Sequence, residues 1–214
     1  MVDVPCYAGV DVGGRRKGFD VAILDAHGVL CCHGRRLPSA QAVWDLIAHF
    51  SPAAIAIDSP RSPAPDGCTS REGERALSRA GICQIRWTPD HRTIEEGGRY
   101  YEWIRCGLAL YALLEERAET PVIEVFPTAS WTRWHRRREG EHRSRWSTTA
   151  LTRLGIAESP VRTSQDLRDA IAAAGTAYQW AHGETEAFGE IVVPRGGWPR
   201  FGRGSAGAVT PAAS

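Results

Sequence analysis

A carboxylate at the end of an apolar strand constrains this chain more than any other feature of its sequence. Residues 7–10 form an apolar, β-forming run that leads directly into Asp11. A glycine-rich turn at 12–18 follows, and a second apolar run at 19–24 completes a strand, a turn and a strand. Burying a carboxylate costs free energy unless something pairs with it. Asp11 is therefore either a cap of this turn or a ligand for a cation whose other ligands come from elsewhere in the chain.

The pattern of apolar residues predicts the order of the remaining elements. A third strand is expected at 29–37, then a helix that begins at the N-cap Ser39 and runs to residue 50. A continuous apolar run at 53–58 is typical of a strand buried on both faces, and it ends in Asp58. Further helices are expected at 70–80, 100–118, 146–154 and 165–182, a loop at 88–98, and short strands at 82–87, 121–127 and 190–194.

This order predicts an α/β fold of the ribonuclease H-like type. Such a fold has a mixed sheet, in which three antiparallel strands are followed by parallel strands, with helices on both faces. We expect one domain at 1–200 with a helical and loop insertion at about 59–99, since prolines 60, 63 and 65 interrupt regular structure there. Residues 202–214 are rich in Gly, Ala, Ser and Pro, which predicts a disordered tail.

Composition argues against several classes of protein. The hydrophobic share of 43% and the charged share of 24% are ordinary for a globular domain. No apolar run reaches the length of about 18 residues that a membrane-spanning helix needs, and the start does not resemble a signal peptide, so we expect a cytoplasmic protein. The six cysteines form no Cys-x-x-Cys pair and no zinc-site spacing with histidine, which predicts reduced thiols.

Two predicted strands end in carboxylates that this fold would bring together. In a ribonuclease H-like sheet the strands that end in Asp11 and Asp58 are parallel neighbours, about 5 Å apart. Ligands of open α/β sheets collect at this edge. Two like charges so close either raise a pKa or require a cation, and Mg²⁺ (or Mn²⁺) suits oxygen ligands.

The last long helix adds two more acids. Asp166 and Asp169 are three residues apart and so share a flank, and the alanines after them allow close packing on the sheet. Glu124, in the strand expected beside Asp58, completes the set or supports it from behind. Such a cluster suits two-metal phosphoryl transfer, in which one ion activates water and the other, about 4 Å away, stabilises the leaving oxygen. The candidate catalytic residues are Asp11, Asp58, Glu124 and Asp169, and the candidate metal ligands are Asp11, Asp58, Asp166 and Asp169.

Each acid also has an ordinary structural interpretation. Asp11 can be a turn residue, and Asp58, before Ser-Pro, can cap an Asx-type turn. Glu124 can be purely structural, and Asp166 is favoured near the start of a helix by the helix dipole. Asp169 has the least local reason for its position. These interpretations are weaker together than singly, because one topology would gather all of the acids.

A basic stretch at 131–146 is the candidate nucleic-acid surface. Its arginines, interleaved with tryptophans, could follow a phosphate backbone and stack bases. The alternative is a solvated, mobile helix and loop whose tryptophans return to the core. The candidate nucleic-acid-binding residues are Lys17, Arg133, Arg136, Arg137, Arg138, Arg143 and Arg145. Arg71 and Glu74 have the spacing of an exposed helix face with ion pairs, or alternatively contact a substrate.

The chain resembles domain-of-unknown-function family 429, a family of predicted nucleases with a ribonuclease H-like fold. The resemblance extends over nearly the whole chain, through the segments 9–13, 57–60, 71–82, 124–127, 166–170, 185–187 and 191–194. The Asp166-x-x-Asp169-Ala helix also resembles the last motif of RuvC-type Holliday-junction resolvases. That resemblance implies metal binding by Asp11, Asp58, Asp166 and Asp169, although those resolvases usually carry Glu where this chain has Asp58.

Three functions follow as hypotheses. The first is a metal-dependent nuclease that hydrolyses phosphodiester bonds. The second is a nucleotide-binding phosphotransferase or ATPase, since residues 11–14 also resemble the phosphate loop of the sugar-kinase and actin-like superfamily. That superfamily usually has a duplicated domain, for which 214 residues leave little room. The third is a non-catalytic nucleic-acid-binding module. The sequence leaves open whether the substrate is DNA or RNA, and the oligomeric state.

Overall fold

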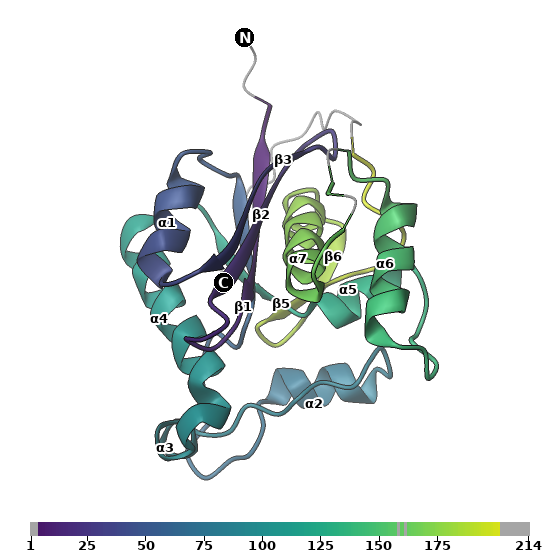
Figure 1. Ribbon diagram of the computed structural model, residues 1–214. Coiled ribbons are helices and arrows are strands. Elements are labelled where there is room, and N and C mark those ends of the chain that lie inside the picture. Colours follow the sequence, from purple (N-terminus) through teal and green to yellow (C-terminus); the bar gives the residue numbers. More distant parts are fainter. Residues whose placement is uncertain (1–3, 158, 161, 202–214) are drawn as a thin grey trace.

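A seven-stranded mixed sheet forms the centre of the protein, with the order β3-β2-β1-β4-β5-β7-β6 (Figure 1). The structure is a computed structural model that describes residues 4–157, 159–160 and 162–201. The tail expected to be disordered, 202–214, lies outside these residues. The strands are β1 (Cys6–Val12), β2 (Phe19–Asp25), β3 (Leu30–Leu37), β4 (Ala54–Asp58), β5 (Val122–Val125), β6 (Thr185–Phe188) and β7 (Ile191–Pro194).

The strand directions confirm the predicted fold. β1, β2 and β3 pair antiparallel in a meander. β4 pairs parallel to β1, β5 parallel to β4, and β7 parallel to β5. The chain therefore has the expected α/β, ribonuclease H-like mixed sheet. One strand was not predicted: β6 pairs antiparallel with β7 at the edge of the sheet.

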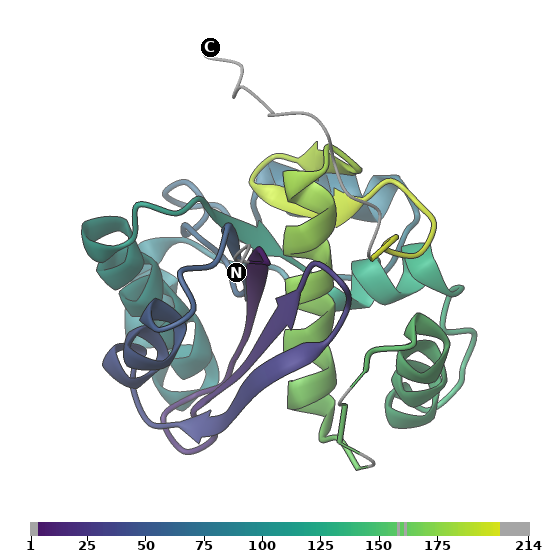
Figure 2. The same ribbon diagram turned by 90° about the horizontal axis from the view of Figure 1, so that it is seen from above.

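Helices cover both faces of the sheet (Figure 2). On one face α1 (Ala40–Ala48), with Ser39 as its N-cap, and α4 (Glu102–Arg117) pack against the side chains of β1, β2 and β4. On the other face lie α7 (Gln165–Ala181), α5 (Pro127–Trp134) and α6 (Arg143–Leu154). The segment between β4 and α4 contains α2 (Glu72–Arg79), α3 (His91–Glu96) and a 3-10 turn (Gly98–Tyr101), and α2 and α3 lie beyond the sheet's lower end (Figure 1).

Two local predictions were wrong. Residues 82–87 form no strand, because Ile82 and Ile85 pack into the apolar cluster around α2 and β7 instead of pairing. The expected loop at 88–98 contains α3, which Asp90 caps by accepting a hydrogen bond from the Thr93 backbone. This helix buries only Ile94, so it has no apolar period that a sequence pattern could detect. The basic stretch at 131–146 begins in the last turn of α5 and ends in the first turn of α6, and residues 135–142 between them form no helix.

Two expectations from composition concern the cysteines and the membrane-spanning potential of the helices. None of the six cysteines is joined to another in a disulfide. Among the described residues, none of the helices combines the length and apolar character needed to cross a membrane.

The contact between α7 and β1 positions the acidic flank of α7. Gly9 lies directly beneath the helix backbone: a Cβ atom there would come 2.1 Å from the Ala170 carbonyl oxygen and 2.2 Å from the Ala174 nitrogen. Only a residue without a side chain permits this approach. Asp11 follows Gly9 by two residues, and Asp166 precedes Ala170 by one helical turn. The close contact therefore sets the first turn of α7 beside the end of β1.

We expect Gly9→Ala to destabilise the protein and to weaken any activity of the strand-end acids. The new methyl group collides with backbone, so α7 must shift, and overpacking of this kind costs about 1–3 kcal/mol. The melting temperature should fall by about 2–4 °C for each kcal/mol. Gly67→Ala is the control, since Gly67 is exposed and its Cβ would meet no atom within 4 Å, although its φ of +75° strains alanine. An unchanged melting temperature for Gly9→Ala would show that α7 has room to move.

Candidate active site

Two carboxylates meet at the ends of neighbouring parallel strands. Asp11, the penultimate residue of β1, is in register with Asp58, the final residue of β4. Ile57 pairs with Glu124 in β5, so that this glutamate lies one position back along the next strand. Parallel neighbours are separated by about 4.8 Å. The structure thus places Asp11 and Asp58 side by side, as the predicted topology requires.

The surroundings of Asp11 and Asp58 disfavour the charged forms of these two acids. Burial is the largest cause that raises the pKa of Asp11 well above its usual range, followed by the carboxylates of Asp58, Asp169 and Asp166, while Lys17 opposes the shift. Burial, and then the nearby Asp169 carboxylate, raise the pKa of Asp58 to about 8, with Arg143 acting in the opposite direction. The strand acids and the acids of α7 therefore share one electrostatic environment, in which an added cation would be stabilised.

Cations and polar groups hold the two acids of α7. The Lys17 ammonium donates to Asp166 Oδ1 at 2.9 Å. Asp169, with only 2% of its surface exposed, accepts from Arg143 at 2.8 Å, from Gln165 at 3.0 Å and from Trp131 Nε1 at 3.3 Å. Burial raises the pKa of Asp169, and Arg143 is the main group that opposes it. Asp169 is thus fully hydrogen-bonded in this conformation, whereas Asp11 and Asp58 face each other.

The donor set fits a hard divalent cation in chemistry, although the side chains are not arranged as a finished site. Every acid offers carboxylate oxygens, the ligands that Mg²⁺ and Mn²⁺ take in proteins. Repulsion among Asp11, Asp58 and the acids of α7 is the physical reason that a cation would be bound there. In the residues described, no three acidic, histidine or cysteine side chains are placed closely enough to hold an ion. Asp169 would have to exchange its Arg143 contact to join such a set.

Glu124 is held in a buried ion network and does not face Asp58 freely. Arg71, with 7% of its surface exposed, donates to Glu124 Oε2 at 2.8 Å and, through its second terminal nitrogen, to Oε1. Arg71 Nε donates at 3.1 Å to Glu74 Oε1, and the Thr88 backbone N–H donates a further hydrogen bond to the same carboxylate. Burial raises the pKa of Glu124, and Arg71 opposes the shift. The interpretation of Arg71 and Glu74 as an exposed helix face is therefore wrong; spacing alone cannot distinguish a solvated ion pair from a buried one.

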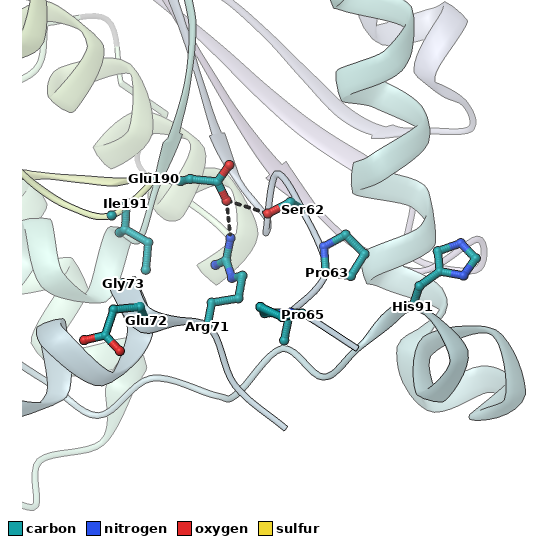
Figure 3. Close-up of a pocket in the computed structure, with 11 residues that line it drawn as sticks. Ser62, Pro63, Pro65, Arg71, Glu72, Gly73, His91, Glu190 and Ile191 are labelled. Atoms are coloured by element: carbon teal, nitrogen blue, oxygen red, sulfur yellow. Dashed lines mark hydrogen bonds and ion pairs between the residues drawn. The ribbon is translucent and has the colours of Figure 1, made fainter. Parts of the chain in front are cut away.

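Arg71 also borders a second cavity, on the far side of this network. The cavity measures about 490 Å³ and is lined by residues 62–65, the start of α2, His91 and the β6–β7 turn. Figure 3 shows Glu190 pointing toward both Arg71 and Ser62. Glu190 Oε2 accepts from Ser62 Oγ at 2.6 Å and from Arg71 at 3.2 Å. The guanidinium of Arg71 thus joins three carboxylates from α2, β5 and the β6–β7 turn.

The acids open into a cleft of about 700 Å³ whose walls come from several elements. One wall is the glycine turn after β1, another is the start of α4, and a third is the insertion at 84–88. Among the cations that line it, Lys17, Arg138 and Arg143 were predicted from sequence, Arg71 was considered there only as an alternative, and Arg86 was missed. Arg86 carries no sequence signal, because it lies in an irregular segment. The acidic residues of the cleft are Asp11, Asp58, Glu74, Glu124, Asp166 and Asp169.

The rest of the basic stretch turns away from the cleft. Arg133 pairs with Glu186, and Arg136 pairs with Glu141. Arg137 and Arg145 are exposed and line neither the cleft nor the second cavity. Its tryptophans, Trp131, Trp134 and Trp146, are buried in the core beside α7, although Trp146 also borders the floor of the cleft. The structure therefore supports the alternative in which these rings return to the core, and it leaves them unable to stack bases.

We expect Asp58→Asn to stabilise the metal-free protein at pH 8 and to have little effect near pH 4. The pKa of Asp58 is about 8 in the folded protein and about 4 in the unfolded chain. Between these values the folded state holds the extra proton, so the free energy of unfolding falls as pH rises. Asparagine removes this dependence. Thermal melts in chelator from pH 4 to 9 would test this; parallel curves for the variant and the wild type would contradict it.

Comparison with known proteins identifies the family. The family model described as a protein of unknown function (DUF429) matches residues 9–191. No curated protein gives a significant match. Two solved structures are similar, each with a TM-score of 0.44: Thermus thermophilus RuvC at 16% identity, over 83% of this chain and 96% of that one, and T. thermophilus RuvC in complex with a Holliday junction substrate at 15% identity, over 79% and 90%. Because the family model spans most of its length, this chain belongs to the DUF429 family.

Proposed function

We propose that this protein is a metal-dependent nuclease that hydrolyses phosphodiester bonds in the cleft beside Asp11. The observation that carries the proposal is the direct pairing of Asp11 with Asp58, with the two acids of α7 close enough to raise the pKa of Asp11. A site of purely structural acids would satisfy them with hydrogen bonds or cations. Here Asp11 and Asp58 lie against each other at the edge of a cleft, and burial and the neighbouring carboxylates raise the pKa of both. We assign Asp11, Asp58, Asp166 and Asp169 as the metal ligands.

The remaining cleft residues have roles that suit a polyanionic substrate. Mg²⁺ or Mn²⁺, when bound, would supply an activated water and stabilise the leaving oxygen. Lys17, Arg138 and Arg143 give the cleft cationic groups that bind phosphates. Lys17 and Arg143 also neutralise Asp166 and Asp169 when no cation is present. Glu124 supports the site indirectly, because its ion pair with Arg71 holds that guanidinium in the wall of the cleft.

The proposal is tested with labelled oligonucleotides. Single-stranded DNA and RNA, duplexes and a branched junction are incubated with the protein in Mg²⁺, in Mn²⁺ or in chelator. We expect cleavage of at least one substrate with metal and none in chelator, together with Mn²⁺ binding in calorimetry. Absence of both cleavage and metal binding would overturn the proposal. Oligonucleotide binding without cleavage would instead support the non-catalytic module.

The glycine turn gives the phosphotransferase alternative a specific test. Residues 13–18 lie beside Asp11, as a phosphate loop would, but most of their backbone N–H groups are already bonded. Gly13 donates to the Gly18 carbonyl, Lys17 and Gly18 donate to the Gly14 carbonyl, and Arg15 donates to Glu102. A phosphate cradle requires N–H groups that point at the ligand. We therefore favour the nuclease, and a thermal shift produced by ATP and Mg²⁺ without nucleic acid would reverse this preference.

A further inference from the structure

Trp103 has no partner in the part of the chain that the structure describes. The chain has eight tryptophans, and six of them belong to a hydrophobic cluster of the core. The remaining two are Trp87, which is 49% exposed, and Trp103, which is half-buried. Trp103 makes no hydrogen bond and no ring contact with a described residue, and it lines the cleft that contains Asp11 and Asp58. A large aromatic ring, partly covered by the protein, thus lines the cleft outside the hydrophobic clusters of the core.

The position of Trp103 relative to the acids is fixed by its neighbour. Glu102 Oε2 accepts from the Arg15 backbone N–H at 3.0 Å. A Cβ atom on Gly14 would lie only 2.7 Å from the same oxygen, so the glycine turn rests directly on the first turn of α4. The turn carries Lys17 and begins beside Asp11. Trp103 therefore lines the same part of the cleft as the glycine turn, with Lys17 and Asp11 at its ends.

The size of the cleft limits what can reach the acids. Its volume of about 700 Å³ falls in the range of about 300–1,000 Å³ that holds drug-sized ligands, which is comparable with one or two nucleotides. Gln84, Ile85, Arg86 and Thr88 of the insertion line it together with the sheet edge. An intact duplex is too wide to enter such a space. Enzymes with enclosed sites act on single strands, or on nucleotides that have left the stack.

We propose that Trp103 is the platform on which a base of the substrate stacks, and that the substrate enters the cleft as a single strand or an unpaired nucleotide. The proposal rests on the nuclease function proposed above and names its substrate class. Stacking on an aromatic ring tolerates any base, because every base has a π face. The cleft cations would hold the neighbouring phosphates. Trp103 thereby becomes a positioning residue that selects unpaired substrates over duplexes. The sequence pattern around it did not single it out.

The test compares Trp103→Ala with Trp87→Ala, a matched removal of an unclustered tryptophan outside the cleft. Binding of a labelled single-stranded oligonucleotide is measured by anisotropy in an Asp11→Asn background, which blocks cleavage. We expect Trp103→Ala to weaken binding by about 5- to 150-fold, the range for loss of one base stack. Trp103→Phe should keep most of the affinity, and Trp87→Ala all of it. A duplex of the same sequence should bind more weakly than the single strand.

An abasic scan separates stacking from a general structural effect. An abasic site is moved along the oligonucleotide, and at one position it should weaken binding to the Trp103 protein but not to Trp103→Ala. Equal sensitivity of both proteins at every position, or equal affinity for the intact strand, would overturn the proposal. If the wild-type protein cleaves with metal and Trp103→Ala binds and cleaves equally well, the proposed nuclease function is supported and the proposed stacking role of Trp103 is overturned. If binding depends on Trp103 but no cleavage occurs, the stacking role is supported and the nuclease function is overturned. Absence of binding overturns both the stacking role and the nuclease function.

Discussion

Replacing Asp11 with asparagine is expected to abolish metal-dependent cleavage and, in the same experiment, to raise the melting temperature of the metal-free protein. Asp11 is the acid on which Asp58, Asp169 and Asp166 all act, so its removal relieves the repulsion that burial intensifies. The loss of a central ligand should lower the rate by at least about 10²–10³-fold, the cost of removing one preorganised catalytic group. Initial rates in Mg²⁺ and thermal melts in chelator measure the two effects.

The opposite signs of these effects make the result specific. A variant that merely misfolds loses activity and stability together, whereas loss of a functional carboxylate removes activity and increases stability. Asp66→Asn is a suitable control, because Asp66 is exposed and outside the cleft. It should leave both the rate and the melting temperature unchanged. If Asp11→Asn keeps the wild-type rate, the carboxylates are not the metal site that we propose.

Arg71→Met is expected to cause the largest loss of stability. It removes the cation between Glu74 and Glu124, two acids that are almost completely buried. Removing one partner of a buried ion pair costs about 3–5 kcal/mol, because the other charge remains unpaired. At about 2–4 °C for each kcal/mol, the melting temperature should fall by about 6–20 °C. Differential scanning calorimetry at pH 7 gives the measurement.

Two further variants test the cause of that loss. Arg92→Met removes an arginine from an exposed pair with Glu96 and should have little effect. Adding Glu124→Gln to Arg71→Met removes one of the stranded charges and should restore part of the stability. If the double variant is no more stable than Arg71→Met, the loss comes from packing of the arginine side chain and not from unpaired carboxylates.

The sheet could be predicted because its signals are local. Apolar runs at 7–10, 19–24 and 53–58 mark strands by composition alone, and tight turns leave few ways to connect the first three. The positions of Asp11 and Asp58 at strand ends follow from the same runs. Their pairing in register then follows from the topology, since one strand order places those two strands side by side. The acids of α7 were assigned to the site from helical spacing in the same way.

The contacts between distant segments could not be predicted. Lys17 and Asp166 are 149 residues apart in the chain, and Arg71 and Glu124 are 53 apart. Nothing in the pattern around Arg71 distinguishes a buried guanidinium from a solvated one, and the exposed-face interpretation failed for that reason. The tryptophans of the basic stretch were ambiguous in the same way, because a helix of mixed character can turn either face inward.

The sequence by itself therefore determined the strand order and the acids that the strands and α7 deliver to one edge. Both depend on short-range periodicity and chain connectivity. Only the tertiary structure decided which charges neutralise which, how closely α7 approaches Gly9, and that the insertion lines a cleft together with Trp103. Those outcomes depend on side-chain burial and on backbone approach within a few ångströms, and many elements that are far apart in the chain determine them jointly.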